Sequence, residues 1–284
     1  MNNTFNFNRF GKVLAADGRK YYRNFSITVA ILSSLTLVLW LLTLVFSFTM
    51  PTFVRWGMIY LAVALACIMV PAKAFGDINL QREGIRFAMM PASNLEKFLS
   101  YAFFCLLTPV VVFFLSWGLD SLLTALPLGG YSHYIKSFGI MESVQNFAME
   151  MGEMTEADMV GDDYEAFQAF SGKFDSGYLF SHIVRIVFTV GLFMFGNLLF
   201  KTHKTAKTLA CMIGISYVIT MLMQSYFLSR GIYPWQHEVN TASMDMESLT
   251  NYTTHAMLLG IIFRSLLAVA LYVGLFFKLK TQKY

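Results

Sequence analysis

The chain has 284 residues, of which 56% are hydrophobic and 13% charged. A soluble domain is nearer half apolar and a quarter charged, so this composition excludes a protein that hides all its apolar side chains in one water-soluble core. The net charge of +4 is modest, and the charges lie in a few segments between long apolar runs. We therefore expect an all-α integral membrane protein.

Residues 1–25 are polar and basic and precede the first apolar run. Their apolar residues recur at roughly helical spacing between cations: Phe7, Phe10, Leu14, Tyr21 and Phe25. This pattern predicts an amphipathic helix lying in the membrane interface, although a basic tail that only sets topology is the alternative. No short apolar region with a small-residue cleavage site occurs here, so we expect no removable signal peptide.

Residues 26–284 are predicted to form a transmembrane domain. The hydrocarbon layer needs about 20 apolar residues per helical span. Six runs of that length occur, at residues 26–48, 56–75, 98–119, 179–200, 209–228 and 256–277. Three cysteines fall inside such runs, and we interpret Cys67, Cys105 and Cys211 as buried small residues with free thiols.

The distribution of charge predicts the orientation. Lysine and arginine dominate the N-terminus, the connections after the second and fourth spans, and the C-terminus. An insertion at about residues 126–177, between spans three and four, is acidic. Because lysine and arginine favour the cytoplasmic side, six spans put both termini in the cytoplasm and the acidic segment outside.

Motifs for catalysis are missing from the sequence. The Gly11-Lys12 and Gly172-Lys173 pairs lack the other residues of a phosphate-binding loop, and His237-Glu238 lacks the second histidine of a zinc peptidase. We expect no catalytic activity in this chain. If ATP drives the protein, a partner chain binds it.

The segment between the second and third spans has a readable local structure. Pro91 ends one short helix, predicted over residues 80–90, and Ser93 with Glu96 has the pattern of a capping box that starts the next. A surface helix placed there, turned sharply into the third span, is suited to being pushed by a partner.

This segment resembles the permease subunits of the ABC-2 type export family, in which an acidic-Gly element, an apolar helix and a Pro-x-Ser turn lead into the third span. The matching positions are Glu83, Gly84, Phe87, Met90, Pro91, Ser93 and Glu96. Ile85 and Asn94 depart from the family's usual threonine and basic residue, and the external segment after span three is long.

The resemblance implies that these residues form a coupling helix seated on a separate ATP-binding subunit, which carries ATP and magnesium. It implies a permease of an exporter in the bacterial cytoplasmic membrane, paired with a second permease chain or a copy of itself. The alternative from a different class is a non-transporting accessory or sensor subunit whose acidic external segment binds a ligand or envelope protein. The sequence identifies no substrate and no nucleic-acid partner.

Two arginines lie inside predicted spans. Arg185 and Arg264 are about 9 and 12 Å from the outer ends of the fourth and sixth spans, at 1.5 Å per residue. Either they line a pocket for an anionic substrate or lipid headgroup, together with His182, or they snorkel outward to acids such as Asp120 or those of the long external segment.

The external loops contain methionine clusters at residues 149–154 and 244–246. Thioethers bind Cu(I), but an apolar stripe on a small helix is the commoner reason for such spacing, so we predict no metal site. Asp162, Asp163 and Glu165 are likewise interpreted as a solvated acidic face rather than a cation site. Ala206, Ala210 and Gly214 form a small-residue face suited to close helix packing.

Overall fold

The computed structural model describes residues 5–47, 50, 52–74, 89, 91–126, 162–200, 202–229 and 246–281. Over these residues the chain forms six helices: α1 (Phe7–Phe46), α2 (Thr52–Ala74), α4 (Asn94–Thr124), α6 (Asp162–Leu199), α7 (Lys204–Ser229) and α8 (Met246–Thr281). Each contains a segment that is long and apolar enough to cross a membrane. The prediction of an all-helical integral membrane protein with six spans is confirmed at this level.

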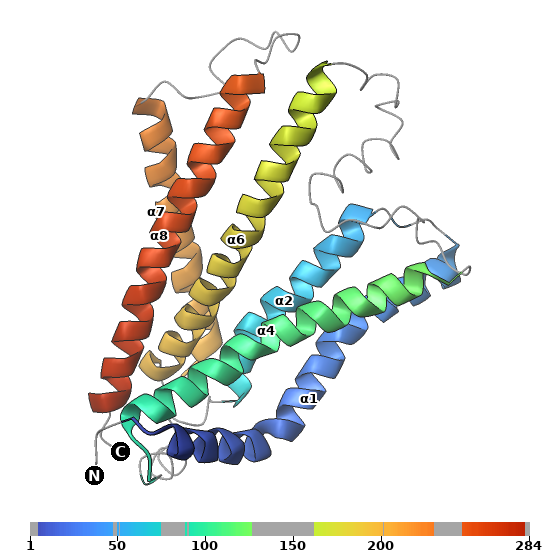
Figure 1. The fold of residues 1–284 in the computed structure, drawn as a ribbon. Helices are drawn as coiled ribbons and strands as arrows, with labels where there is room; N and C mark the ends of the chain where they lie inside the picture. Colours follow the sequence, from blue (N-terminus) through green and yellow to red (C-terminus); the bar gives the residue numbers. More distant parts are fainter. Residues whose placement is uncertain are drawn as a thin grey trace.

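In Figure 1, α1, α2 and α4 form one group of helices and α6, α7 and α8 another, and α2 packs against α6 between the groups. The groups lie side by side at the end of the bundle that holds both termini, and they splay apart toward the other end (Figure 1). At the closed end the Phe98 ring of α4 meets Tyr272 and Phe276 of α8, with ring centroids 6.4 and 5.9 Å apart. An even number of crossings accounts for the termini sharing one end.

Helix α1 combines the predicted amphipathic helix and the first span in one continuous element. Its first part lies across the base of the bundle before the helix turns upward (Figure 1). The predicted boundary at residue 25 therefore falls inside a helix. One face of the first part, with Val13, Asp17 and Tyr21, is buried in the protein, whereas Phe7 remains 79% exposed.

The other five helices all begin before the predicted spans, and the difference is largest for α4, α6 and α8. Helix α4 exceeds the predicted 98–119 at both ends, α6 includes residues 162–177 of the predicted external segment, and α8 begins at Met246 rather than near residue 256. The reason is that membrane solvation requires only an apolar stretch of about 20 residues, whereas a helix continues until its backbone groups are capped. At α4 that cap is Ser93.

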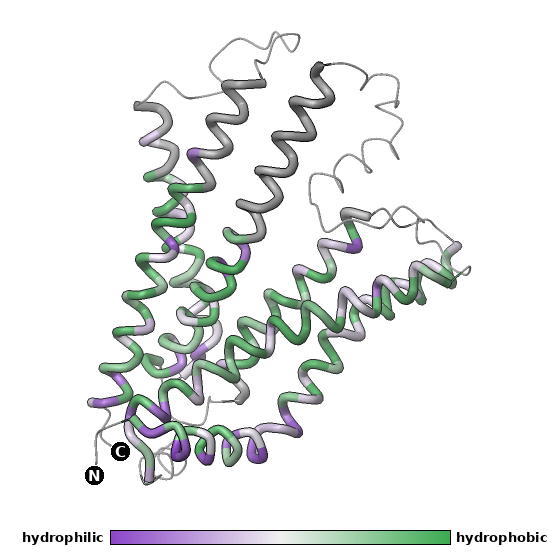
Figure 2. Tube along the Cα trace, viewed as in Figure 1, coloured by the Kyte–Doolittle hydropathy of each residue, from purple (hydrophilic) through white to green (hydrophobic). Residues whose placement is uncertain are grey.

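Small residues fill the centre of the packing. Ala62, Ala66 and Cys67 of α2 are buried, as is Cys105 of α4, and they let the helix backbones approach closely. Hydrophilic residues gather at the end of the bundle with the termini, while the middles of the helices are apolar (Figure 2). This distribution matches a protein whose middle is surrounded by lipid.

Helix α7 packs mainly against α6, and most of its remaining surface is exposed. Thr208 is buried against Gly196, where an added Cβ would lie 2.0 Å from the threonine Oγ1. Ala206, Ala210 and Gly214 are exposed instead of packed within this chain. The prediction that all three cysteines are buried is wrong for Cys211, which lies on the exposed surface of α7, whereas Cys67 and Cys105 are buried; all three are free.

Candidate functional site

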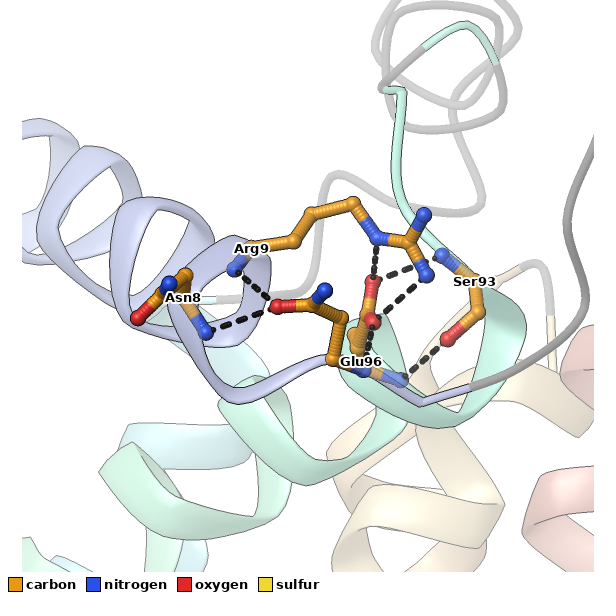
Figure 3. Close-up of polar contacts among 5 residues, drawn as sticks. Asn8, Arg9, Ser93 and Glu96 are labelled. Carbon is orange, nitrogen blue, oxygen red and sulfur yellow. Dashed lines mark hydrogen bonds and ion pairs between the residues drawn. The ribbon is translucent and has the colours of Figure 1, made fainter.

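Glu96 joins three segments at the start of α4 (Figure 3). Its Oε2 accepts hydrogen bonds from Arg9 Nε at 2.7 Å and from the Ser93 backbone N–H at 2.9 Å. Its Oε1 accepts from Arg9 Nη2 at 2.8 Å and from the Asn6 backbone N–H at 2.9 Å. The side chain is fully buried. One carboxylate therefore holds the first turn of α1 and the 91–93 turn on α4.

The local caps of both helices contribute to this cluster. The Asn6 side chain accepts from the backbone N–H groups of Asn8 and Arg9, which starts α1. Ser93 Oγ accepts from the Glu96 N–H at 3.3 Å, and with the reciprocal bond this completes the predicted capping box. The capping prediction is confirmed.

Glu96 precedes the apolar 98–119 segment. The groups around its carboxylate stabilise the negative charge. The hydrogen bonds from Arg9 lower the pKa of the Glu96 carboxyl to about 2, against the opposing effect of burial. The carboxylate is therefore ionised at neutral pH, and its bidentate pair with the guanidinium has the geometry of a strong, charge-assisted interaction.

A second polar contact lies two turns farther along α1. Ser100 Oγ donates to Asp17 Oδ2 at 2.6 Å, and both side chains are buried. Burial raises the pKa of Asp17, and the hydrogen bond from Ser100 partly opposes that rise. Glu96 and Ser100 are four residues apart and share one face of α4, so the two contacts align the first part of α1 along that face.

The predicted coupling residues divide into two sets. Pro91 is exposed at the turn, and Ser93 and Glu96 are buried behind it. Glu83, Gly84, Phe87 and Met90 lie outside the described residues, as does the predicted helix at 80–90 except for Met89. The sequence identified Glu96 as a helix-start residue but missed Arg9 and Asn6 as its partners, since nothing in their spacing points to residues about 90 positions away.

An ion pair joins α2 to α4 at the opposite end of the helices. Arg55 Nη2 donates to Asp120 Oδ2 at 2.6 Å and to Thr124 Oγ1 at 2.6 Å, and Arg55 Nε donates to Asp120 Oδ1 at 3.2 Å. The side chains of Arg55 and Asp120 are only 1% and 6% exposed. Asp120 therefore pairs with Arg55. It does not pair with Arg185 or Arg264, as one alternative from the sequence had suggested.

The structure brings together His182, Arg185 and Arg264. His182 and Arg185 are three residues apart on α6, and the charges of both arginines act on the His182 ring. The His182 ring stacks on Tyr60 of α2, with centroids 4.6 Å apart and planes inclined by 13°. Arg185 is exposed and Arg264 half-buried. These side chains and Tyr60 therefore come from three helices, α6, α8 and α2.

Metal-binding predictions concern other parts of the chain. Among the described side chains, no group of three His, Cys, Asp or Glu residues is arranged to hold a metal ion. The methionine cluster at 149–154 and Met244 lie outside the described residues, and nothing is described of the side chains of Asp162, Asp163 and Glu165.

Comparison with known proteins gives no relative. No family model matches the chain, and neither a curated protein nor a solved structure is similar to it.

Proposed function

We propose that this chain is the membrane-spanning permease subunit of an ATP-driven ABC-type exporter. ATP and magnesium bind to separate ATP-binding subunits, and the chain pairs with a second permease chain or a second copy of itself. The proposal combines the resemblance of residues 83–96 to ABC-2 permeases with the membrane-spanning architecture.

The observation that supports it best is the position of Glu96. This buried carboxylate ties the start of α1 and the 91–93 turn to the first turn of α4. A force applied to the segment before Pro91 is then passed to two helices at once, because the contacts that join them leave little freedom at the turn. Such a connection is what a coupling element requires.

The far end of α4 supports the same mechanism. Arg55 and Asp120 hold α4 to α2 at the end where the two helix groups diverge. With contacts at both of its ends, α4 transmits a displacement at its start to α1 and α2 together. In the proposed cycle the α1–α2–α4 group moves as a body against α6–α7–α8, as in other transporters that work by rigid-body motion.

The test is co-purification of the full chain with an ATP-binding protein, combined with ATP hydrolysis in membranes. Phe87→Ala and Glu83→Ala are expected to weaken partner binding while the chain remains inserted, because insertion depends on the apolar spans. Aromatic anchors carry a large share of interface energy, so Phe87→Ala is expected to have the larger effect. Phe277→Ala is the matched control, since Phe277 is an exposed ring of α8 near the same end of the bundle.

Two outcomes would contradict the proposal. If Phe87→Ala and Glu83→Ala bind the partner and stimulate hydrolysis like the unmodified chain, residues 80–90 are not a coupling element. If the chain purifies with no ATP-binding partner at all, the accessory or sensor function becomes the better explanation.

A further inference from the structure

Two like charges are held at one level in the apolar part of the bundle. Helices α6 and α8 run in the same direction (Figure 1). A Cβ at Gly274 would lie 3.3 Å from the Phe195 ring, so these two positions, 79 apart in the sequence, lie at one level. Arg185 and Arg264 are also 79 apart. This register puts the two backbone positions at one level, where counting from the span ends had put them about 3 Å apart in depth.

Close packing keeps this register. A Cβ at Gly191 would lie 2.9 Å from the Tyr272 ring, and Tyr272 Oη donates to the Val187 carbonyl at 3.2 Å. These contacts lie only one or two turns from Arg185. The helices therefore have little freedom to slide and separate the two arginines.

Nothing described near the arginines neutralises them. Asp120 is paired with Arg55, and over the described residues neither Arg185 nor Arg264 has an ion pair with a carboxylate. Ionised side chains at membrane depth are costly unless they find a counter-charge or water. Two arginines at one level therefore require an anion from outside the described residues.

We propose that His182, Arg185 and Arg264 bind the phosphate of an amphiphile, in the half of the bilayer away from the chain termini. Planar guanidinium groups pair with phosphate through two parallel hydrogen bonds, which favours arginine at such sites. The surrounding surface suits an acyl chain, because Ile183, Ile262 and Leu266 are 51, 55 and 66% exposed.

Tyr60 of α2, in the other helix group, borders the site. Its ring stacks on His182 and fixes the plane of the imidazole next to the arginines. Since α2 belongs to the α1–α2–α4 group and the arginines to α6 and α8, movement of one group against the other changes the site. That the phosphate amphiphile is a transported substrate rests on the proposed permease function. That it binds at this site can be tested without that function.

The experiment uses the full chain in a neutral detergent and native mass spectrometry of bound lipid. Dioleoylphosphatidylglycerol is the anionic probe and dioleoylphosphatidylcholine the zwitterionic comparison. We expect the anionic lipid to bind at least about tenfold more tightly, and Arg185→Gln or Arg264→Gln to weaken it by about tenfold or more, as expected for loss of charged hydrogen bonds. Arg23→Gln is the control, because it removes an exposed arginine from the first part of α1.

Lysine variants separate charge from geometry and guard against misfolding. Arg185→Lys and Arg264→Lys keep the charge but lose the planar donor fork, so intermediate affinity is expected at unchanged thermal stability. Inorganic phosphate added as a competitor distinguishes the source of the ligand. Displacement at millimolar concentration would assign the site to soluble phosphate compounds, and no displacement would assign it to lipids.

Equal binding of the two lipids, or unchanged binding of phosphatidylglycerol in the Arg185→Gln/Arg264→Gln double variant, would overturn the proposal. The measurement needs no ATP-binding partner. A failed partner pull-down would therefore leave this site intact, and a failed lipid titration would leave the coupling proposal untouched.

Discussion

Glu96 shows how a single buried charge organises the base of the bundle. It accepts four hydrogen bonds, two from the Arg9 guanidinium and two from backbone N–H groups. An ionised carboxylate removed from water is tolerated only when its lone pairs are satisfied in this way. Removing any donor leaves part of that charge without compensation.

The first prediction concerns Arg9. Arg9→Gln is expected to lower the melting temperature of the chain, because it removes two hydrogen bonds to a buried carboxylate. Arg9→Lys should recover part of this loss, because a lysine retains the charge without the two-pronged geometry. Thermal unfolding of the purified chain in detergent measures both. Arg19→Gln, an exposed arginine on the same helix, is the control, and an equal loss there would show that Arg9 has no special role.

The second prediction is a pH dependence. The folded-state pKa of Glu96, about 2, is below its ordinary value of 4.5, so the ionised carboxylate stabilises the fold. This contribution is fully present above about pH 4.5 and is lost as the pH falls toward 2. Glu96→Gln is therefore expected to be less stable than the unmodified chain at pH 7, with the difference shrinking between pH 4.5 and 2. A difference that is independent of pH would contradict the assignment.

The third prediction concerns the ion pair at the opposite end. Arg55→Met and Asp120→Leu are each expected to destabilise the chain by about 3–5 kcal/mol, because each leaves a buried charge without its partner. The double variant should be considerably more stable than either single variant, since apolar side chains replace both charges. Thermal unfolding of the three variants forms a complete cycle, and additive losses would show that the two side chains act independently.

At the scale of helices, glycines decide which pairs come close. Gly196 of α6 lies against Thr208 of α7, whose Oγ1 donates to the Lys204 carbonyl at 2.7 Å. Because threonine is branched at Cβ and its hydroxyl is engaged, it has little room to turn away. The contact therefore fixes the position of α7 against α6. Few other contacts within the described residues hold α7 in place.

The fourth prediction follows from this contact. Gly196→Ala is expected to push α7 away from α6 and to lower the melting temperature, because the new methyl would lie 2.0 Å from Thr208 Oγ1. Thr208→Ala in the same chain should restore part of the loss by making space. Gly214→Ala is the control, since nothing lies within 4 Å of a Cβ placed there. The assignment fails if both glycine variants melt at the same temperature.

At the scale of the whole molecule, the six-helix architecture fits the orientation predicted from charge. The start of α1 and the end of α8 lie at one end of the bundle, together with the start of α4 and the start of α7 (Figure 1). The basic connections predicted to be cytoplasmic therefore share one end. Which side of the membrane that end faces remains a prediction.

The fifth prediction tests that orientation. In a chain freed of Cys67, Cys105 and Cys211, a cysteine at Gly172 is expected to react with a membrane-impermeant reagent added to intact cells. A cysteine at Thr205 is expected to react only after the membrane is opened. Labelling of both positions from the same side would rule out an odd number of crossings between them and with it the six-span topology.

The number of spans, the apolar middle of the bundle and the cap at Ser93 were determined by the sequence alone. Each depends on local properties, namely the length of an apolar run or the spacing between a cap and its partner three residues later. Such features need no knowledge of distant segments. The helix ends were less predictable, because α6 and α8 continue beyond the apolar runs that define their spans.

The tertiary structure alone decided which charges meet. Arg9 pairs with Glu96 and Arg55 with Asp120, 87 and 65 positions apart, and no spacing rule links residues at such separations. The sequence named His182, Arg185 and Arg264 as one candidate pocket, but the common level of the two arginines follows from how Gly191 and Gly274 let α6 and α8 pack. Register between helices is set by the fit of side chains across the interface, a property of two surfaces and not of either sequence segment.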